Sequence, residues 1–214
     1  MSTMMNMDAS DWDLDMYRDM FDTNTDGYNL IFMLFDCSGS VSGTILGSIK
    51  NIMEEITSEH ENSGIKTIVA QLSEKVIWMN EIPVDIHQFV SWRKISSDGC
   101  LYLGRCFEEI SDKISEKKWL EFEKNAKETR FILISDGMSV DQYKTGLKKL
   151  KQNNIFANAK KYAINMMDVT WALQSEIKEC RILSEFTGDS KFVIDASSMN
   201  SGEIEKVFEQ IVFG

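Results

Sequence analysis

The stretch LIFMLFDCSGS (residues 30–40) decides the fold of this chain. Its first six residues are apolar without alternation, which is typical of a strand buried on both faces of a parallel sheet. The run ends at Asp36, and a short polar loop with Gly39 follows. Because ligands of open α/β sheets collect beyond the carboxyl ends of the strands, we expect a functional site at Asp36.

Strand-like and helix-like segments alternate through the rest of the chain. RFILISD (130–136) is a second continuous apolar run that ends in Asp, while IKTIVAQLS (65–73) and KVIWMNEI (75–82) are too close for a crossover helix and predict a hairpin. We expect further strands at 161–166 and 191–196, and helices at about 103–125, 142–152, 171–186 and 202–213. This order predicts a doubly wound α/β fold, with a mostly parallel central sheet, one antiparallel edge strand and helices on both faces.

Composition and charge narrow the function classes. The 214 residues carry 34 acidic and 23 basic side chains, a net charge of -11, which repels nucleic acid and anionic membrane surfaces. The amino-terminal residues lack a basic and apolar leader, and no apolar run approaches the roughly 18 residues of a membrane span. We therefore expect a cytoplasmic protein with no nucleic-acid partner and no membrane association. The four cysteines form no CxxC pair and are expected to be reduced thiols.

The chain divides into an acidic, Met-rich amino-terminal segment (1–28) and a domain (29–214). The segment has seven Asp, one Arg and six of the 13 Met residues. It also predicts a short amphipathic helix whose apolar side includes Trp12, Met16, Met20 and Phe21. Two roles remain open for that side: packing on the domain, or binding a partner protein, since Met-rich faces adapt to varied surfaces.

Two carboxylates are expected to meet at the centre of the sheet. The two longest apolar strands end in Asp36 and Asp136, and neighbouring strands would bring both to one crevice. Like charges there require a cation or hydrogen-bond donors. Ser38 and Ser40 add neutral hydroxyl oxygens, and Gly39 lets the loop turn tightly. Oxygen ligands with few charges favour Mg²⁺ or Mn²⁺, with coordination positions left for water or an incoming carboxylate.

DCSGS (36–40) resembles the DxSxS signature of von Willebrand factor A (VWA) domains and their metal-ion-dependent adhesion site. The resemblance implies that Asp36, Ser38, Ser40 and Asp136 hold a divalent cation whose open position is filled by an acidic side chain of a protein partner. It also implies a threonine ligand from a middle loop, but GCLYLG (99–104) places Leu101 there. Ser97 or Asp98 could supply the missing oxygen, or a water could fill the position.

Two further segments resemble the small bacterial TerY-like VWA proteins of tellurite-resistance and stress-response gene clusters. They are ISDGMSVDQYKTGLKKLK (134–151) and ILSEFTGDSKFVID (182–195). The resemblance implies a cytoplasmic adaptor of a bacterial stress-response or defence system. Its implied partners are kinase-like, phosphatase-like or other Ter proteins, bound rather than chemically changed.

Enzyme chemistry lacks its usual residues in this sequence. Haloacid dehalogenase-type phosphohydrolases carry DxDx[TV] after the first strand, but Ser38 stands where the second Asp is needed. The chain has neither a GxSxG elbow nor a phosphate-binding GxxxxGK[ST] loop. We therefore predict a non-enzymatic interaction module. A degenerate VWA scaffold that binds without metal is the alternative, and a metal-dependent hydrolase is a distant third.

Overall fold

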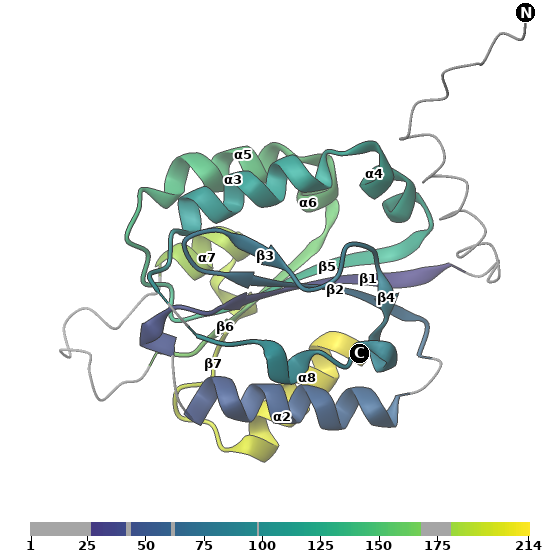
Figure 1. The fold of residues 1–214 in the computed structure, drawn as a ribbon, viewed down its shortest axis with the longest axis vertical. Helices are drawn as coiled ribbons and strands as arrows, with labels where there is room; N and C mark the ends of the chain where they lie inside the picture. The colour runs from purple at the N-terminus through teal and green to yellow at the C-terminus, as the bar shows by residue number, and fades with distance from the viewer. Residues whose placement is uncertain (1–26, 42–43, 61–62, 98, 168–180) are drawn as a thin grey trace, which may run out of the picture.

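A single mixed sheet forms the centre of the computed structural model, which describes residues 27–41, 44–60, 63–97, 99–167 and 181–214 (Figure 1). Its seven strands are β1 (Tyr28–Asp36), β2 (Ile65–Leu72), β3 (Val76–Trp78), β4 (Val84–Asp85), β5 (Ala126–Ser135), β6 (Lys160–Asn165) and β7 (Val193–Asp195). The strand order is β3-β2-β1-β5-β6-β7, and β4 also pairs with β2. The two continuous apolar runs thus form neighbouring strands in the middle of the sheet.

The pairing directions confirm the predicted fold class. β1 pairs in parallel with β2 and β5, β5 with β6, and β6 with β7. β3 runs antiparallel to β2, so the predicted hairpin lies at the sheet edge, although β3 ends at Trp78. Beyond Trp78, the Asn80 side chain takes over the hydrogen bonds to the backbone of β2. Its Oδ1 accepts from Val69 N at 2.9 Å, and its Nδ2 donates to Thr67 O at 2.8 Å.

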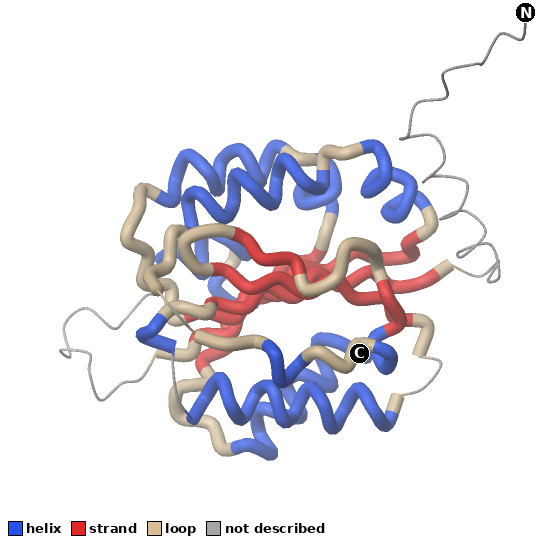
Figure 2. The backbone as a smooth tube through the Cα atoms, in the orientation of Figure 1, coloured by secondary structure: helices blue, strands red, loops and turns tan. Residues whose placement is uncertain are grey.

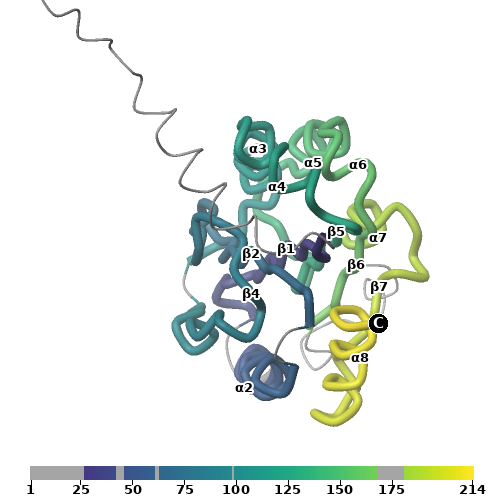
Figure 3. The backbone as a smooth tube through the Cα atoms, turned by 90° about the vertical axis from the view of Figure 1, so that its right-hand side faces the viewer, coloured from purple at the N-terminus to yellow at the C-terminus, as the bar shows by residue number. Residues whose placement is uncertain are grey.

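Helices cover both faces of the sheet (Figure 2). On one face lie α3 (Leu103–Ile114), α4 (Lys117–Lys124), α5 (Tyr143–Gln152), α6 (Asn154–Asn158) and α7 (Arg181–Thr187), and on the other α2 (Thr44–Glu59) and α8 (Ser201–Phe213) (Figure 3). Four 3₁₀ helices are described: η1 (Gly39–Val41), η2 (Ile86–Gln88), η3 (Trp92–Lys94) and η4 (Ser190–Phe192). None of the helices described is long and apolar enough to cross a bilayer.

The core consists of two hydrophobic clusters, one on each face of the sheet. In β1, Phe32 faces the cluster under α3 to α7, and Phe35 faces the cluster under α2 and α8. Both side chains are fully buried. Phe32 stacks on Phe131 of β5 with ring centroids 4.3 Å apart. A strand with large apolar residues on both faces has no solvent-exposed side, which explains why its sequence does not alternate.

The helix predicted at 103–125 is two helices in the structure, so that prediction was wrong at its centre. α3 ends at Ile114, and α4 begins at Lys117 after a turn in which Ser115 N donates to Asp112 O at 3.1 Å. The break brings Trp119 onto the core, where it is fully buried 5.8 Å from the ring of Phe32. Helical spacing alone does not reveal such a turn, because both halves are good helix formers.

Smaller differences concern the carboxy-terminal half. The strand predicted at 191–196 is the shorter β7, preceded by η4, and α6 was not predicted. Helix α8 begins as capping chemistry requires: the Asn200 side chain accepts from Glu203 N at 3.1 Å, and the Glu203 side chain accepts from Asn200 N at 2.9 Å. Of the helix predicted at 171–186, the part up to residue 180 lies outside the described residues, as does the amino-terminal helix with Trp12.

Candidate functional site

Asp36 and Asp136 meet at one edge of the sheet. Asp36 ends β1 and Asp136 directly follows β5, while Phe35 and Ile134 pair across the two strands. Both carboxylates are buried, with 0% and 3% of their surface exposed. The charge of Asp136 contributes to raising the pKa of Asp36, so the two groups lie close enough to interact.

The Asp36 carboxylate is held by donors on both oxygens. Oδ1 accepts from Ser38 N at 2.9 Å, and Oδ2 accepts from Ser135 Oγ at 2.6 Å. Burial nevertheless dominates and raises the pKa of Asp36 to about 6, with hydrogen bonds from Ser135 and Ser38 acting in the opposite direction. A buried carboxylate with a raised pKa is stabilised in its charged form by any nearby cation.

Ser38 and Ser40 present a pair of hydroxyl oxygens beside this carboxylate. The loop turns through η1, where Val41 N donates to Ser38 O at 3.2 Å. The two Oγ atoms lie 3.0 Å apart, with Ser38 buried and Ser40 exposed. Gly39 N donates to Gly99 O at 3.0 Å, which ties the loop to the segment where the resemblance expects a third ligand.

Leu101 provides no side-chain oxygen to this site. Its side chain is 1% exposed and belongs to the hydrophobic cluster beneath α3, and its carbonyl accepts from Val140 N at 2.9 Å. Of the two proposed substitutes, Ser97 is half-buried between η3 and Gly99, and Asp98 lies outside the described residues. The middle loop thus lacks, at Leu101, the side-chain hydroxyl that the VWA resemblance implies.

The donor set suits a small hard cation. Octahedral Mg²⁺ with ligands at about 2.0–2.1 Å requires neighbouring oxygens about 2.9 Å apart, and the Ser38 and Ser40 oxygens meet that spacing at 3.0 Å. Within the described residues, no three His, Cys, Asp or Glu side chains gather closely enough to hold a metal. A cation here would therefore combine the carboxylates of Asp36 and Asp136 with hydroxyl and water oxygens, the oxygen-only ligand set that Mg²⁺ and Mn²⁺ favour.

Sequence reasoning missed the residues that fix this site in place. Ser135 Oγ joins both sides, because it donates to Asp36 and accepts from Gly137 N at 2.9 Å. Ser139 and Asp141 stand just before α5 and have the composition of its cap, but they cap α3 instead. Leu103 N donates to Ser139 Oγ at 2.9 Å, while Gly104 N and Arg105 N donate to Asp141 at 2.9 Å each. Only the tertiary arrangement reveals which helix they serve.

Cys37 is a core residue and not a nucleophile. It is 2% exposed, and burial, together with the negative charge of Asp36, raises its pKa to about 12. The thiol is therefore protonated at neutral pH.

Exposed apolar side chains flank the carboxylates. Met138 and Val140 are 61% and 64% exposed. Their backbone is fixed at the site, because Met138 N donates to Asp136 Oδ1 at 2.8 Å and Val140 N donates to Leu101 O. Met138 and Val140 thus add exposed apolar surface to the loop that follows Asp136.

The raised pKa of Asp36 predicts a pH-dependent stability in the absence of divalent cations. Since its folded pKa of about 6 lies above the ordinary 3.8, the folded state holds the proton more tightly, and stability falls as pH rises through this window. Ionisation of Asp36 should therefore lower the free energy of unfolding by about 3 kcal/mol between pH 3.5 and 7. Urea denaturation in chelator at pH 4.5 and 7.5 should show a smaller pH dependence in Asp36→Asn than in wild type. The exposed Asp195→Asn, at the end of β7, is the control and should keep the wild-type dependence; an unchanged slope in Asp36→Asn would contradict the assignment.

Comparison with known proteins supports the fold. No protein-family model matches the chain, and no curated protein matches it. Solved structures do match. A von Willebrand factor type A protein from Catenulispora acidiphila aligns with a TM-score of 0.62 and 13% identity, over 87% of this chain and 42% of that one. The matched region is thus less than half of that protein.

Two other solved structures also match over most of this chain. The manganese-loaded TRAP protein of Plasmodium vivax aligns with a TM-score of 0.58 and 15% identity, over 87% of this chain and 74% of that one. An aerotolerance-related membrane protein from Bacteroides fragilis aligns with a TM-score of 0.51 and 12% identity, over 87% and 98% of the chains. At such identities the likeness establishes the fold: this chain has the architecture of VWA domains.

Proposed function

We propose that this VWA-fold protein is a non-enzymatic interaction module that binds a protein partner through a divalent cation held at Asp36, Ser38, Ser40 and Asp136. The observation that carries the proposal is the convergence of two buried carboxylates and two hydroxyl groups at the carboxyl ends of β1 and β5. The two hydroxyl oxygens, of Ser38 and Ser40, lie 3.0 Å apart. When bound, Mg²⁺ or Mn²⁺ would supply a coordination position for an acidic side chain of the partner.

The residues around the carboxylates support binding rather than turnover. Ser135 and Ser38 hold the Asp36 carboxylate by hydrogen bonds, so that it keeps one orientation. Met138 and Val140 offer apolar contact area beside it. The TRAP protein with the same fold is described as manganese-loaded, which agrees with the proposed type of ion.

We place this module in a bacterial stress-response or defence system, as an adaptor for kinase-like, phosphatase-like or Ter proteins. The support is the TerY-like sequence of residues 134–151 and 182–195. A structure with this fold is described as aerotolerance-related, which also fits a stress setting. In this chain Ser139, Asp141 and Gly146 of the first segment maintain the contact between α3 and α5.

The buried Leu101 favours a second candidate, a scaffold that binds partners without metal. Its apolar side chain occupies the position of the expected threonine and packs into the core. In that case binding would depend on surface contacts and on the predicted helix with Trp12, Met16, Met20 and Phe21. Deletion of residues 1–28 would then abolish partner binding, and chelator would have no effect.

Metal-dependent stabilisation separates the two candidates. At roughly 100 times the dissociation constant, Mg²⁺ or Mn²⁺ should stabilise the fold by about 2.7 kcal/mol, which corresponds to a rise in Tm of about 5–10 °C. The rise should be larger at pH 7.5 than at pH 5, because a protonated Asp36 has to lose its proton before it binds a cation. Differential scanning calorimetry with and without EDTA measures both effects.

Variants link this stabilisation to partner capture. Asp36→Ala and Ser40→Ala should each abolish the Tm shift, and Ser40 is exposed, so its replacement leaves the core intact. Asp195→Ala, an exposed Asp at the end of β7, is the matched control and should retain the shift. In pull-downs from the native host, Asp36→Ala and Ser40→Ala should fail to capture the partner that wild type captures. Equal capture in EDTA would contradict the metal-dependent proposal and favour the scaffold.

A further inference from the structure

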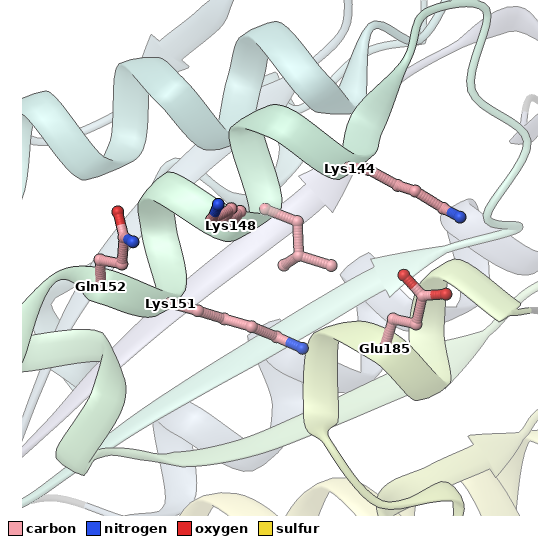
Figure 4. Close-up of a pocket in the computed structure, with 6 residues that line it drawn as sticks. Lys144, Lys148, Lys151, Gln152 and Glu185 are labelled. Carbon is pink, nitrogen blue, oxygen red and sulfur yellow. The ribbon is translucent and has the colours of Figure 1, made fainter.

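The surface of α5 is basic on an otherwise acidic protein. Residues 142–161 contain six Lys and no Asp or Glu, whereas the whole chain has a net charge of -11. Between α5 and α7 lies an open groove of about 330 Å³, lined by Lys144, Leu147, Lys148, Lys151, Gln152 and Glu185. Figure 4 shows Lys144 and Lys151 extending from α5 toward α7, where Glu185 stands.

None of the three groove lysines forms a salt bridge with another described residue, although Lys144 lies close enough to Glu185 to contribute to lowering the pKa of that carboxylate. The one acidic residue of the groove, Glu185, is already paired with Arg181 at 2.7 Å. Lys149 differs from its neighbours, since it leaves the groove and pairs with Asp112 of α3 at 2.6 Å. Burial and the charge of Lys151 lower the pKa of Lys161. The groove therefore carries a local positive field that attracts an anionic partner.

The chain itself supplies a segment of complementary charge. Residues 1–28 carry seven Asp and one Arg, a net charge of -6. Asp8, Asp11 and Asp15 recur at intervals of three and four, and the groove lysines 144, 148 and 151 recur at four and three. On two antiparallel helices these intervals match, since seven residues span about 10.5 Å on each. With the predicted helix continuing to Phe21, the stretch from Asp15 to Tyr28 reaches up to about 30 Å, which spans much of one face of a domain of this size.

We propose that the acidic amino-terminal segment docks in the lysine groove between α5 and α7 of its own chain, with Asp8, Asp11 and Asp15 facing Lys151, Lys148 and Lys144. The groove is on α5 and α7, and none of its lining residues belongs to the candidate metal site. The amino-terminal segment would then bind its own chain in the absence of a partner, and a partner with a more acidic segment would displace it from the groove.

Zero-length carbodiimide cross-linking of the full chain, followed by peptide mass mapping of the monomer, tests the docking. Wild type should yield links from the amino-terminal Asp residues to Lys144 and Lys151. Lys148→Glu should reduce these links about three- to fivefold, because it places a like charge among the Asp residues while both reporter lysines remain. Lys149→Glu is the matched control, with the same change in net charge, and should leave the links at wild-type yield.

A compensating change makes the test specific. Asp11→Lys in the Lys148→Glu background should restore the links to Lys144 and Lys151, and both variants should keep the wild-type Tm. Equal effects of Lys148→Glu and Lys149→Glu, or links no more frequent than those to exposed lysines of α4, would overturn the proposal. Links confined to a cross-linked dimer and lost on dilution would also overturn it, since the occupant would then be a second copy.

Discussion

Gly146→Ala is expected to destabilise the domain by about 3 kcal/mol, at the upper end of what an inserted methyl group costs in a packed interior. A Cβ at Gly146 would lie 1.9 Å from the carbonyl oxygen of Gly104 and 2.7 Å from its carbonyl carbon. Both contacts are with backbone, so α3 and α5 would have to separate, because no flexible side chain is available to yield. Separation would also loosen the bonds from Asp141 to the first turn of α3.

Gly47→Ala is the control for this substitution. Gly47 lies in α2, and a Cβ there would meet no atom within 4 Å. The replacement should stabilise the protein by about 0.5–1 kcal/mol through helix propensity alone. Urea denaturation monitored by circular dichroism gives both values. If Gly146→Ala stayed within about 0.5 kcal/mol of wild type, the close contact of α3 and α5 would be wrong.

Arg130→Met is expected to cost about 3 kcal/mol, within the range found when one partner of a buried charged network is removed. Arg130 is 6% exposed in β5, and its guanidinium holds the end of α8. Nη1 donates to Ile211 O at 2.9 Å and to Val212 O at 3.1 Å, while Nη2 donates to Gly214 O at 2.8 Å. Nε donates to the Glu128 carboxylate. The last carbonyls of a helix have no partner within the helix, so a cation there satisfies them and the negative end of the helix dipole.

Hydrogen exchange locates the effect of this substitution. Amides of α8 should exchange faster in Arg130→Met, whereas those of β1 should change only in proportion to global stability. Arg130→Lys retains the charge but not the planar fork, so its loss should be intermediate. Arg93→Met, which removes an exposed arginine paired with Glu54, should remain close to wild type. Equal exchange of α8 in Arg130→Met and Arg93→Met would show that the hydrogen bonds from Arg130 to the end of α8 do not stabilise this helix.

The sequence predicted what depends on local pattern. The apolar runs that end in Asp36 and Asp136 have no polar alternation, so both had to be central strands, and neighbouring parallel strands bring their carboxyl ends together. The edge hairpin followed from the short connection between its strands. Gly99 contacts Gly39, but the role of this loop as a source of a metal ligand stays a prediction, and Leu101 provides no hydroxyl there.

What the sequence could not predict depends on distant contacts. Arg130 is an ordinary strand residue in the sequence, and only the return of α8 makes it a clamp. Ser139 and Asp141 have the composition of a cap for the helix that follows them, but their acceptors face α3. The break between α3 and α4 depends on where Trp119 can be buried. In each case the local preference is compatible with several arrangements, and tertiary packing selects one.

The loop between β5 and α5 is fastened at both ends, and this has a consequence for recognition. Asp136 begins the loop at the candidate site, and Asp141 ends it on the backbone of α3. A partner that shifted the loop would have to release the first turn of that helix, so rearrangement on binding is unfavourable. We therefore expect a partner to meet a surface that already has its bound shape. Competing partners would then associate at similar rates and differ mainly in how long they remain bound.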